Sequence, residues 1–339
     1  MNQHLQWLNQ VTEEIIDPER RIIDPHHHLW RRSQPYELNE LWADTGSGHN
    51  VVGTVFIECG AEYHRQGPRE LRPLGETEYV AGIASQSRQG AGLGSTLKGQ
   101  APILGMVGHA DLRLGAGVVD VIEAQREAAA GLLRGIRYST AYYPDPPAVD
   151  RYAGRKAGLM LEKEFREGFS HLASQGLSFD AWLLHPQIKE LIDLAREFPE
   201  TTIVFDHFGG PLGIGPYEGK QAEIFPEWQR DVSELAQNPN VVAKLGGLAM
   251  SINGWGWDTR DRPASSDEIV AAHRDYYLHT IDCFGPQRCM FESNFPVDKE
   301  SVSYSVLWNG FKKMVAGFSE NEKDDLFFGT ASRTYRLEL

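Results

Sequence analysis

Residues 22–30 of the chain read Ile-Ile-Asp-Pro-His-His-His-Leu-Trp. Two β-branched apolar residues that lead into an acid, a proline and three imidazoles are typical of a short buried strand with polar side chains at its carboxyl end. Side chains alternate between the two faces of a strand, so His26 and His28 point the same way and His27 points away. This spacing predicts half of a metal site, or two polar groups that face a substrate.

The rest of the chain repeats the pattern of an apolar run followed by a helical segment. Seven further runs have the character of buried strands: residues 51–58, 103–112, 132–138, 177–185, 202–207, 241–247 and 289–296. Helices are predicted at residues 76–84, 118–130, 159–174, 188–198, 228–236, 267–284 and 331–337. Eight apolar strands that alternate with helices predict a single α/β domain, a (β/α)8 TIM barrel with extended loops over the mouth at the carboxyl ends of its strands. We expect this domain to cover residues 1–339, with residues 1–20 as an N-terminal extension and 31–50 as a loop over the substrate.

The composition limits the partners of the protein. The 339 residues include 33 Lys and Arg against 47 Asp and Glu, a net charge of −14 at pH 7. This charge disfavours nucleic acid and anionic membranes, and no apolar run reaches the ~20 residues of a membrane helix. We expect a small-molecule substrate, which can be anionic where a local arginine binds it, and we leave a homo-oligomer open. Three cysteines without C-x-x-C spacing, and no signal-peptide core, predict a cytoplasmic protein.

Polar side chains fall at or near the carboxyl ends of nearly all the predicted strands. They are His26, His28, Glu58, His109, Arg137, His185, His207, Lys244 and Asn294. In a TIM barrel the chemistry lies at this end of the strands, so we expect these side chains to meet at one mouth.

Three of these histidines have the character of a metal-binding set. His26, His28 and His207 would offer three imidazoles to Zn²⁺ or a similar ion and leave further positions open. Such an ion would polarise a carbonyl oxygen and acidify a bound water. The alternative for His207 is a core histidine that pairs with its neighbour Asp206.

Other strand-end residues are candidates for substrate binding. Arg137 and Tyr138 can clamp a carboxylate, although a salt bridge at the barrel rim would also explain the arginine. Lys244 lies in an apolar run and therefore needs a buried carboxylate partner or a substrate anion. His185 can contact a ligand or pack at a helix start.

The remaining polar candidates divide into a possible base, structural residues and an aromatic loop. Glu58 can serve as base, as ligand or as the partner that orients a histidine. Cys59 is interpreted as a small buried hydrophobe, and His109 as a structural residue beside a glycine. Trp255 and Trp257 lie in a loop dense in aromatic and guanidinium groups, which we expect to cover the substrate.

Motifs along the chain resemble those of one family of enzymes. They are Asp24-x-His26-x-His28-x-Trp30, Phe179-Asp180, Asp206-His207-x-Gly209-Gly210-Pro211, Lys244-Leu245-Gly246-Gly247, Phe284-Gly285-Pro286-x-Arg288-Cys289-Met290-Phe291-x-Ser293-Asn294-Phe295-Pro296 and Phe328-Gly329-Thr330-Ala331-x-Arg333-x-Tyr335. Together they resemble the amidohydrolase-related TIM-barrel hydrolases, and within them the sugar-lactone and dicarboxylate-lactone hydrolases. The resemblance extends from about Ile22 to the end of the chain.

The resemblance implies hydrolysis of a lactone or another cyclic ester by an activated water, in some members with a divalent metal. It places His26, His28 and His207 at the histidine ligand positions. The family usually has Ser-Asp-Trp-Pro where this chain has Ser293-Asn294-Phe295-Pro296. An asparagine cannot accept a proton, so Asn294 is expected to lose the base function and to weaken a metal site.

Several ways of replacing the lost base remain open. Asp298 or Glu58 can activate water, or the histidines can polarise the carbonyl together with a lysine or arginine and without metal. We therefore predict a hydrolase acting on the lactone of a sugar acid or a dicarboxylic acid. The alternatives are a decarboxylase or hydratase of the same superfamily, and a barrel with a degenerate metal site that binds a ligand without turnover.

Overall fold

Eight parallel strands form the centre of the computed structural model, which describes residues 3–90, 99–143 and 156–338. In sheet order they are β1 (Arg21–His27), β2 (Asn50–Ile57), β3 (Ile103–Gly108), β4 (Leu133–Arg137), β5 (Ser178–Ala181), β6 (Ile203–Phe205), β7 (Val241–Leu245) and β8 (Cys289–Phe291). A parallel bridge between His27 and Phe295 joins the last strand segment to the first, and the His28 amide donates to the Phe295 carbonyl at 2.8 Å. The predicted (β/α)8 barrel is confirmed.

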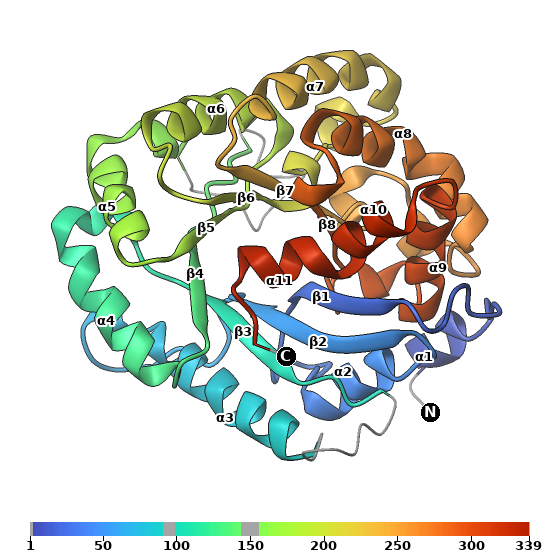
Figure 1. Cartoon of the computed structure of the whole chain (residues 1–339), viewed down its shortest axis with the longest axis horizontal. Coiled ribbons are helices and arrows are strands. Elements are labelled where there is room, and N and C mark those ends of the chain that lie inside the picture. Colours follow the sequence, from blue (N-terminus) through green and yellow to red (C-terminus); the bar gives the residue numbers. More distant parts are fainter. Residues whose placement is uncertain (1–2, 91–98, 144–155, 339) are drawn as a thin grey trace.

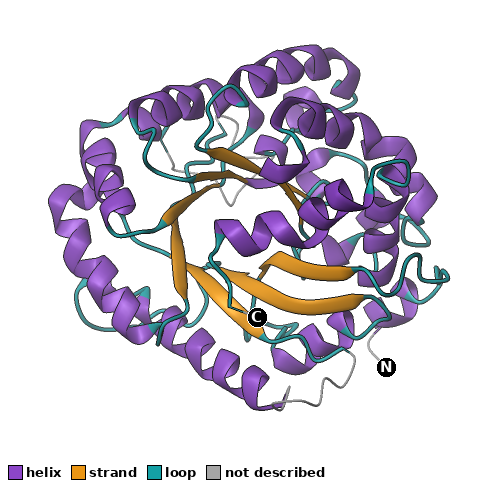
Figure 2. Ribbon diagram, viewed as in Figure 1, coloured by secondary structure: helices purple, strands orange, loops and turns teal. Residues whose placement is uncertain are grey.

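Helices surround the barrel as an outer ring, shown in Figures 1 and 2. The larger ones are α2 (Leu38–Thr45), α3 (Leu74–Gly90), α4 (Val118–Ala128), α5 (Lys163–Ser174), α6 (Ile188–Glu197), α7 (Gln221–Leu235), α8 (Ser266–Phe284) and α9 (Tyr304–Met314). They form because apolar side chains recur at helical spacing on the face toward the sheet, as Ile188, Leu191 and Ala195 do in α6. Shorter helices are α1 (Gln3–Leu8), α10 (Glu320–Asp324) and α11 (Thr330–Thr334).

Several element boundaries differ from the sequence-based prediction. The segment 31–50 contains helix α2 and is not a loop throughout, because Glu37 and Glu40 form a reciprocal cap at its start. The eighth strand ends at Phe291 and not at residue 296, since Asn294 adopts a left-handed φ of 55° and turns the chain. Helix α3 continues to Gly90, beyond the predicted end at residue 84.

The C-terminal segment closes the barrel at the amino ends of the strands. Figure 1 shows α11 lying across the centre of the ring. Leu337 and Tyr335 pack against apolar side chains of the barrel interior, among them Ile23 and Val204. The Tyr335 hydroxyl also donates a 2.6 Å hydrogen bond to Oδ2 of Asp180, on strand β5. This segment thereby seals the end of the barrel opposite the mouth.

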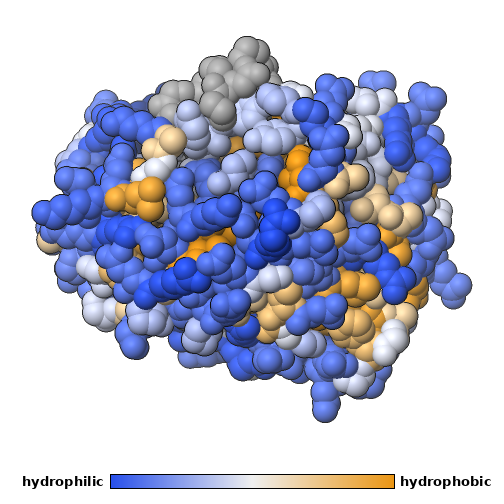
Figure 3. All heavy atoms as spheres, turned by 90° about the horizontal axis from the view of Figure 1, so that it is seen from above, coloured by the Kyte–Doolittle hydropathy of each residue, from blue (hydrophilic) through white to orange (hydrophobic). Residues whose placement is uncertain are grey.

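Figure 3 shows a face that is largely hydrophilic, with separate hydrophobic patches. Among the described residues, no helix combines the length and the apolar character needed to cross a membrane.

Candidate functional site

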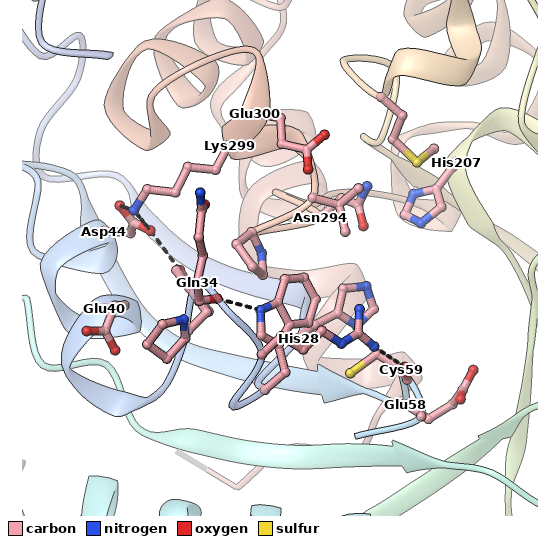
Figure 4. A pocket seen from close by; sticks show the side chains of 18 of the residues that line it. His28, Gln34, Glu40, Asp44, Glu58, Cys59, His207, Asn294, Lys299 and Glu300 are labelled. Atoms are coloured by element: carbon pink, nitrogen blue, oxygen red, sulfur yellow. Dashed lines mark hydrogen bonds and ion pairs between the residues drawn. The ribbon is translucent and has the colours of Figure 1, made fainter. Parts of the chain in front are cut away.

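A cavity of about 1460 Å³ opens at the carboxyl ends of the strands. Its lining includes residues at or just after the ends of five different strands: His28, Glu58, Arg137, His207 and Asn294. Figure 4 shows His28, Glu58, His207 and Asn294 around it. The strand ends therefore bring together residues that are far apart in the sequence, as expected for a barrel of this kind.

The three histidines predicted as a set lie next to one another. The ring centroids of His26 and His28 are 4.9 Å apart, and those of His26 and His207 are 4.4 Å apart. His28 and His207 line the cavity, whereas His26 is fully buried beneath them. Burial lowers the pKa of both His26 and His28. The Lys244 ammonium lowers the pKa of His26 further, and the Arg137 guanidinium lowers the pKa of both.

Hydrogen bonds fix the tautomer of His28. Its Nδ1 lies 2.8 Å from the carbonyl oxygen of Ile57, at the end of β2. A carbonyl can only accept, so Nδ1 carries the proton and Nε2 keeps a free lone pair. His28 is therefore an acceptor at the wall of the cavity.

A buried carboxylate connects the other two imidazoles. Glu292 follows β8, is fully buried, and places Oε1 2.6 Å from Nδ1 of His207 and Oε2 2.7 Å from Nδ1 of His26. Burial lowers the pKa of His207, but the Glu292 carboxylate and its hydrogen bond outweigh this, so that pKa lies above its usual value. Sequence reasoning missed Glu292; the available signal was an acid within the apolar run 289–296.

Lys244 lies below the cavity and not in its lining. Its Nζ is fully buried, 2.7 Å from Oδ2 of Asp180 and 3.3 Å from Oδ1 of Asp206. The ammonium is also 3.3 Å from Nδ1 of His26. The buried carboxylates that this lysine needs are thus supplied by the protein itself.

Arg137 and Glu58 form an ion pair within the cavity wall. Nε of Arg137 donates to Oε1 of Glu58 at 2.9 Å, and the guanidinium also bonds the Glu58 backbone carbonyl. One terminal nitrogen of Arg137 is 3.5 Å from Nε2 of His26 and 3.7 Å from Oδ2 of Asp206. Two of its five N–H groups are used by Glu58, and the others face His26, Asp206 and the cavity.

Asn294 stands between the cavity and Asp298. Its Nδ2 donates a 2.8 Å hydrogen bond to Oδ1 of Asp298, whose other oxygen accepts from the Ala249 amide at 3.2 Å. Asp298 is fully buried and does not line the cavity, while Asn294 does. Burial raises the pKa of Asp298 to about 7.

Besides Lys244, three further residues predicted to bind substrate are not brought to the cavity wall. Trp255 and Trp257 pack on His273 of α8, at ring centroid distances of 5.0 Å and 4.7 Å. His185 is buried, accepts from the Leu212 amide at 3.2 Å and contacts the Tyr217 ring. Trp255 and Trp257 thus pack a neighbouring loop against helix α8.

The other candidates are split between the cavity and the core. Tyr138 and His109 line the cavity with ring centroids 5.3 Å apart, and Cys59 lines it as well. Nδ1 of His109 lies 3.2 Å from the Arg137 carbonyl. His27 points away from the cavity into the core beside Phe56, where burial lowers its pKa to about 3.

Comparison with known proteins identifies the family. The family model described as "Amidohydrolase" matches residues 23–337. The chain belongs to this family. It is therefore a hydrolase of the amidohydrolase superfamily, and its similarity to lactone hydrolases extends over most of its length.

Two relatives and one solved structure give the extent of this similarity. The chain is 32% identical to the uncharacterized protein y4mH of Sinorhizobium fredii, over 93% of this chain and 98% of that protein. It is 28% identical to the L-fucono-1,5-lactonase of Burkholderia multivorans, over 93% and 96%. An amidohydrolase from Burkholderia multivorans, solved with bound zinc, has the same fold, with a TM-score of 0.71 and 21% identity over 94% of this chain and 99% of that one.

Proposed function

We propose that this amidohydrolase opens the lactone ring of a sugar acid with water. The observation that carries the proposal is the meeting of a guanidinium, Arg137, with two imidazoles, His28 and His207, in the wall of one cavity. The similarity to an L-fucono-1,5-lactonase supports the same reaction class.

Arg137 is the group best suited to bind the carbonyl oxygen of the lactone. Its guanidinium stays charged at every relevant pH and keeps donors that Glu58 does not use. Attack of water on the carbonyl carbon places negative charge on this oxygen, and a donor fixed in a buried wall stabilises that charge. The ion pair with Glu58 holds the guanidinium in place before the substrate arrives.

The residues do not fit a divalent cation. Among the described residues, the ligand atoms that lie within 4.8 Å of one another belong to His26, Asp206 and His207, so Asp206 stands in this group where His28 was predicted. Two permanent cations already lie beside His26 and Asp206. Nζ of Lys244 is 3.3 Å from an atom of each, and a terminal nitrogen of Arg137 is within 3.7 Å of an atom of each. Two unit charges 4 Å apart repel by about 4 kcal/mol at a moderate effective dielectric, and a divalent ion would double this for each cation. We therefore propose a mechanism that uses no zinc ion.

The charges of the cavity favour a neutral sugar lactone over a dicarboxylate lactone. Three of the five Arg and Lys side chains in its lining, Arg137, Lys299 and Arg113, are paired with Glu58, Asp44 and Asp111 at 2.7 to 2.9 Å. A fourth, Arg32, donates to the Cys59 carbonyl at 3.0 Å. Neutral polar side chains supply much of the remaining lining: Asn9, Asn39, Ser47, Ser139, Thr140 and Ser303. Such a surface offers donors and acceptors to hydroxyl groups, and the cation in its wall, Arg137, is already neutralised by Glu58.

A pH-indicator assay tests the proposal. Purified protein is offered aldonolactones of five- and six-membered rings and, separately, a dicarboxylate lactone, with spontaneous hydrolysis subtracted. We expect acid release from the sugar lactones, and a loss of about 100-fold or more in kcat/KM for R137Q. R196Q is the matched control, because Arg196 bonds Glu234 on the surface. Absence of acid release across the panel, or release of CO2 in its place, would overturn the proposal.

A further inference from the structure

We propose that His207, held by Glu292, is the base that activates water, in place of the carboxylate that the family usually has at the position of Asn294. Glu292 is then a positioning residue that acts through His207. Both roles rest on the proposed lactone hydrolysis.

The contact between the two residues sets the orientation of the imidazole. A carboxylate can only accept, so Nδ1 of His207 carries the proton in the 2.6 Å hydrogen bond to Glu292. This leaves the lone pair of Nε2 free on the side of the ring away from Glu292. His207 lines the cavity, and Figure 4 shows its ring near Asn294 at the cavity edge.

The backbone at Gly246 and Gly247 packs closely against the side chains of Glu292 and His207. A Cβ on Gly247 would lie 2.3 Å from Nδ1 of His207, and a Cβ on Gly246 would lie 2.4 Å from Cγ of Glu292. His207 itself has a left-handed φ of 52°, a conformation that costs about 1 kcal/mol or more in a residue with a side chain. Two glycines after β7 and a strained residue after β6 thus combine to keep the ring against the carboxylate.

The other candidate bases are less suited by their contacts. Asn294 has an amide, and Asp298 lies behind it, bonded to Asn294 and to the Ala249 amide. The Glu58 carboxylate is engaged with Arg137 at 2.9 Å, so protonating it would weaken that ion pair. His28 does offer a free Nε2, but its Nδ1 donates to a neutral carbonyl, which stabilises an imidazolium less than a carboxylate does.

His26 is excluded by its position. It is fully buried beneath the cavity, and its Nδ1 lies between the Glu292 carboxylate and the Lys244 ammonium. The second Glu292 oxygen therefore faces an imidazole that does not reach the substrate. Of the two rings that Glu292 contacts, His207 is the one that lines the cavity.

The reaction balances with these groups alone. The water oxygen forms a bond to the lactone carbonyl carbon while its proton passes to Nε2 of His207. The bond between that carbon and the ring oxygen then breaks, and the imidazolium returns its proton to the ring oxygen, which gives the hydroxy acid. Glu292 remains a carboxylate and stabilises the imidazolium between the two steps.

The test compares wild type with E292Q. A glutamine amide can donate to Nδ1 of His207, which would move the imidazole proton to Nε2 and remove the base. We expect kcat to fall about 10²- to 10⁴-fold with little change in KM, and E292D to restore part of it. Nitrogen-15 NMR of histidine-labelled protein should show His207 protonated at Nδ1 in the wild type and at Nε2 in E292Q.

E76Q is the matched control for loss of a buried acid. Glu76 is almost fully buried and accepts from the Cys59 and Ala61 amides, which a glutamine oxygen can also do. Its kcat should stay within about threefold of wild type. If E292Q does not fold, the nitrogen-15 spectrum of the wild type carries the test: a His207 ring protonated at Nε2 and not at Nδ1 would overturn the role of Glu292.

The outcomes separate this inference from the proposed function. An active wild type whose E292Q variant keeps its kcat and its His207 tautomer would overturn the role of the pair and leave lactone hydrolysis standing. A wild type that hydrolyses no lactone would overturn the proposed function and the catalytic role together, while the NMR signals would still report whether Glu292 fixes the imidazole.

Discussion

Nδ2 of Asn294 donates a 2.8 Å hydrogen bond to Oδ1 of Asp298, so the wall of the cavity presents an amide and keeps the acid behind it. The neutral residue is thus held by a specific partner. This contact favours an adapted site over a degenerate one, since a remnant of a lost metal site would need no such partner. The distinction can be tested by restoring the acid.

N294D should lower activity and gain no metal. The new carboxyl would face Asp298 at hydrogen-bond distance, and two acids this close share one proton. We expect kcat/KM to fall at least about tenfold, and the variant to be less stable at pH 8 than at pH 6. N294A is the control, because it removes the hydrogen bond without adding charge. Elemental analysis of N294D decides the alternative: bound zinc together with higher activity would indicate a degenerate metal site.

Chelation should leave activity unchanged within about twofold, since Lys244 and Arg137 already supply positive charge beside His26 and Asp206. The measurement is the rate of lactone hydrolysis after dialysis against a strong chelator, with residual metal determined on the same sample. A loss of activity that added zinc restores would contradict this expectation.

Asp298 should make stability fall as pH rises. Its pKa is about 7 in the folded protein, against 3.8 for an ordinary aspartate, because it is fully buried. Between these values the native state keeps a proton that the unfolded state has released, so the free energy of unfolding decreases with increasing pH. From pH 5 to pH 8 the loss from this group is about 2–3 kcal/mol.

Urea unfolding of wild type and D298N at both pH values measures this contribution. The variant cannot titrate at this position, so its decrease in stability between pH 5 and pH 8 should be smaller than that of wild type by the stated amount. Equal decreases in the two proteins would show that Asp298 is already ionised at pH 5.

K244M should destabilise the protein strongly. Lys244 is the fully buried partner of Asp180 and Asp206, and its removal leaves two carboxylates without their cation. Breaking a buried ion pair in this way costs about 3–5 kcal/mol. The control is K189M, because Lys189 is exposed and lies 3.5 Å from Glu227 on the surface, where the change should be within about 0.5 kcal/mol. Similar unfolding free energies for the two variants would argue against a structural role for Lys244.

The barrel and the meeting of three histidines could be predicted because both depend on local patterns. Apolar runs of strand length alternate with helical periodicity, and His26, His28 and His207 each follow such a run. The carboxyl ends of parallel strands in a barrel share one mouth, so strand order alone brings these rings together. No contact between distant residues had to be known in advance.

The partners within the site could not be predicted in the same way. Glu292 was missed because its direction depends on β8 ending at Phe291, which the apolar run 289–296 does not reveal. Trp255 and Trp257 form an aromatic loop by composition, but their packing on His273 of α8 is a tertiary contact without a local signal. Asp298 lies four residues beyond Asn294, and only the turn between them shows that it stands behind the amide.

G247A should impair the site more than the fold. The new methyl group would lie 2.3 Å from Nδ1 of His207, and the φ of +76° at this position is unfavourable for any residue with a Cβ. The His207 ring must move away from Glu292, so we expect kcat to fall about 100-fold, with a loss of about 1–3 kcal/mol in stability. The control is G82A in helix α3, where the added methyl group meets no atom within 4 Å and should stabilise the helix by about 0.5–1 kcal/mol. A G247A variant that keeps both its kcat and its His207 NMR signals would mean that the glycine is not needed to seat the imidazole.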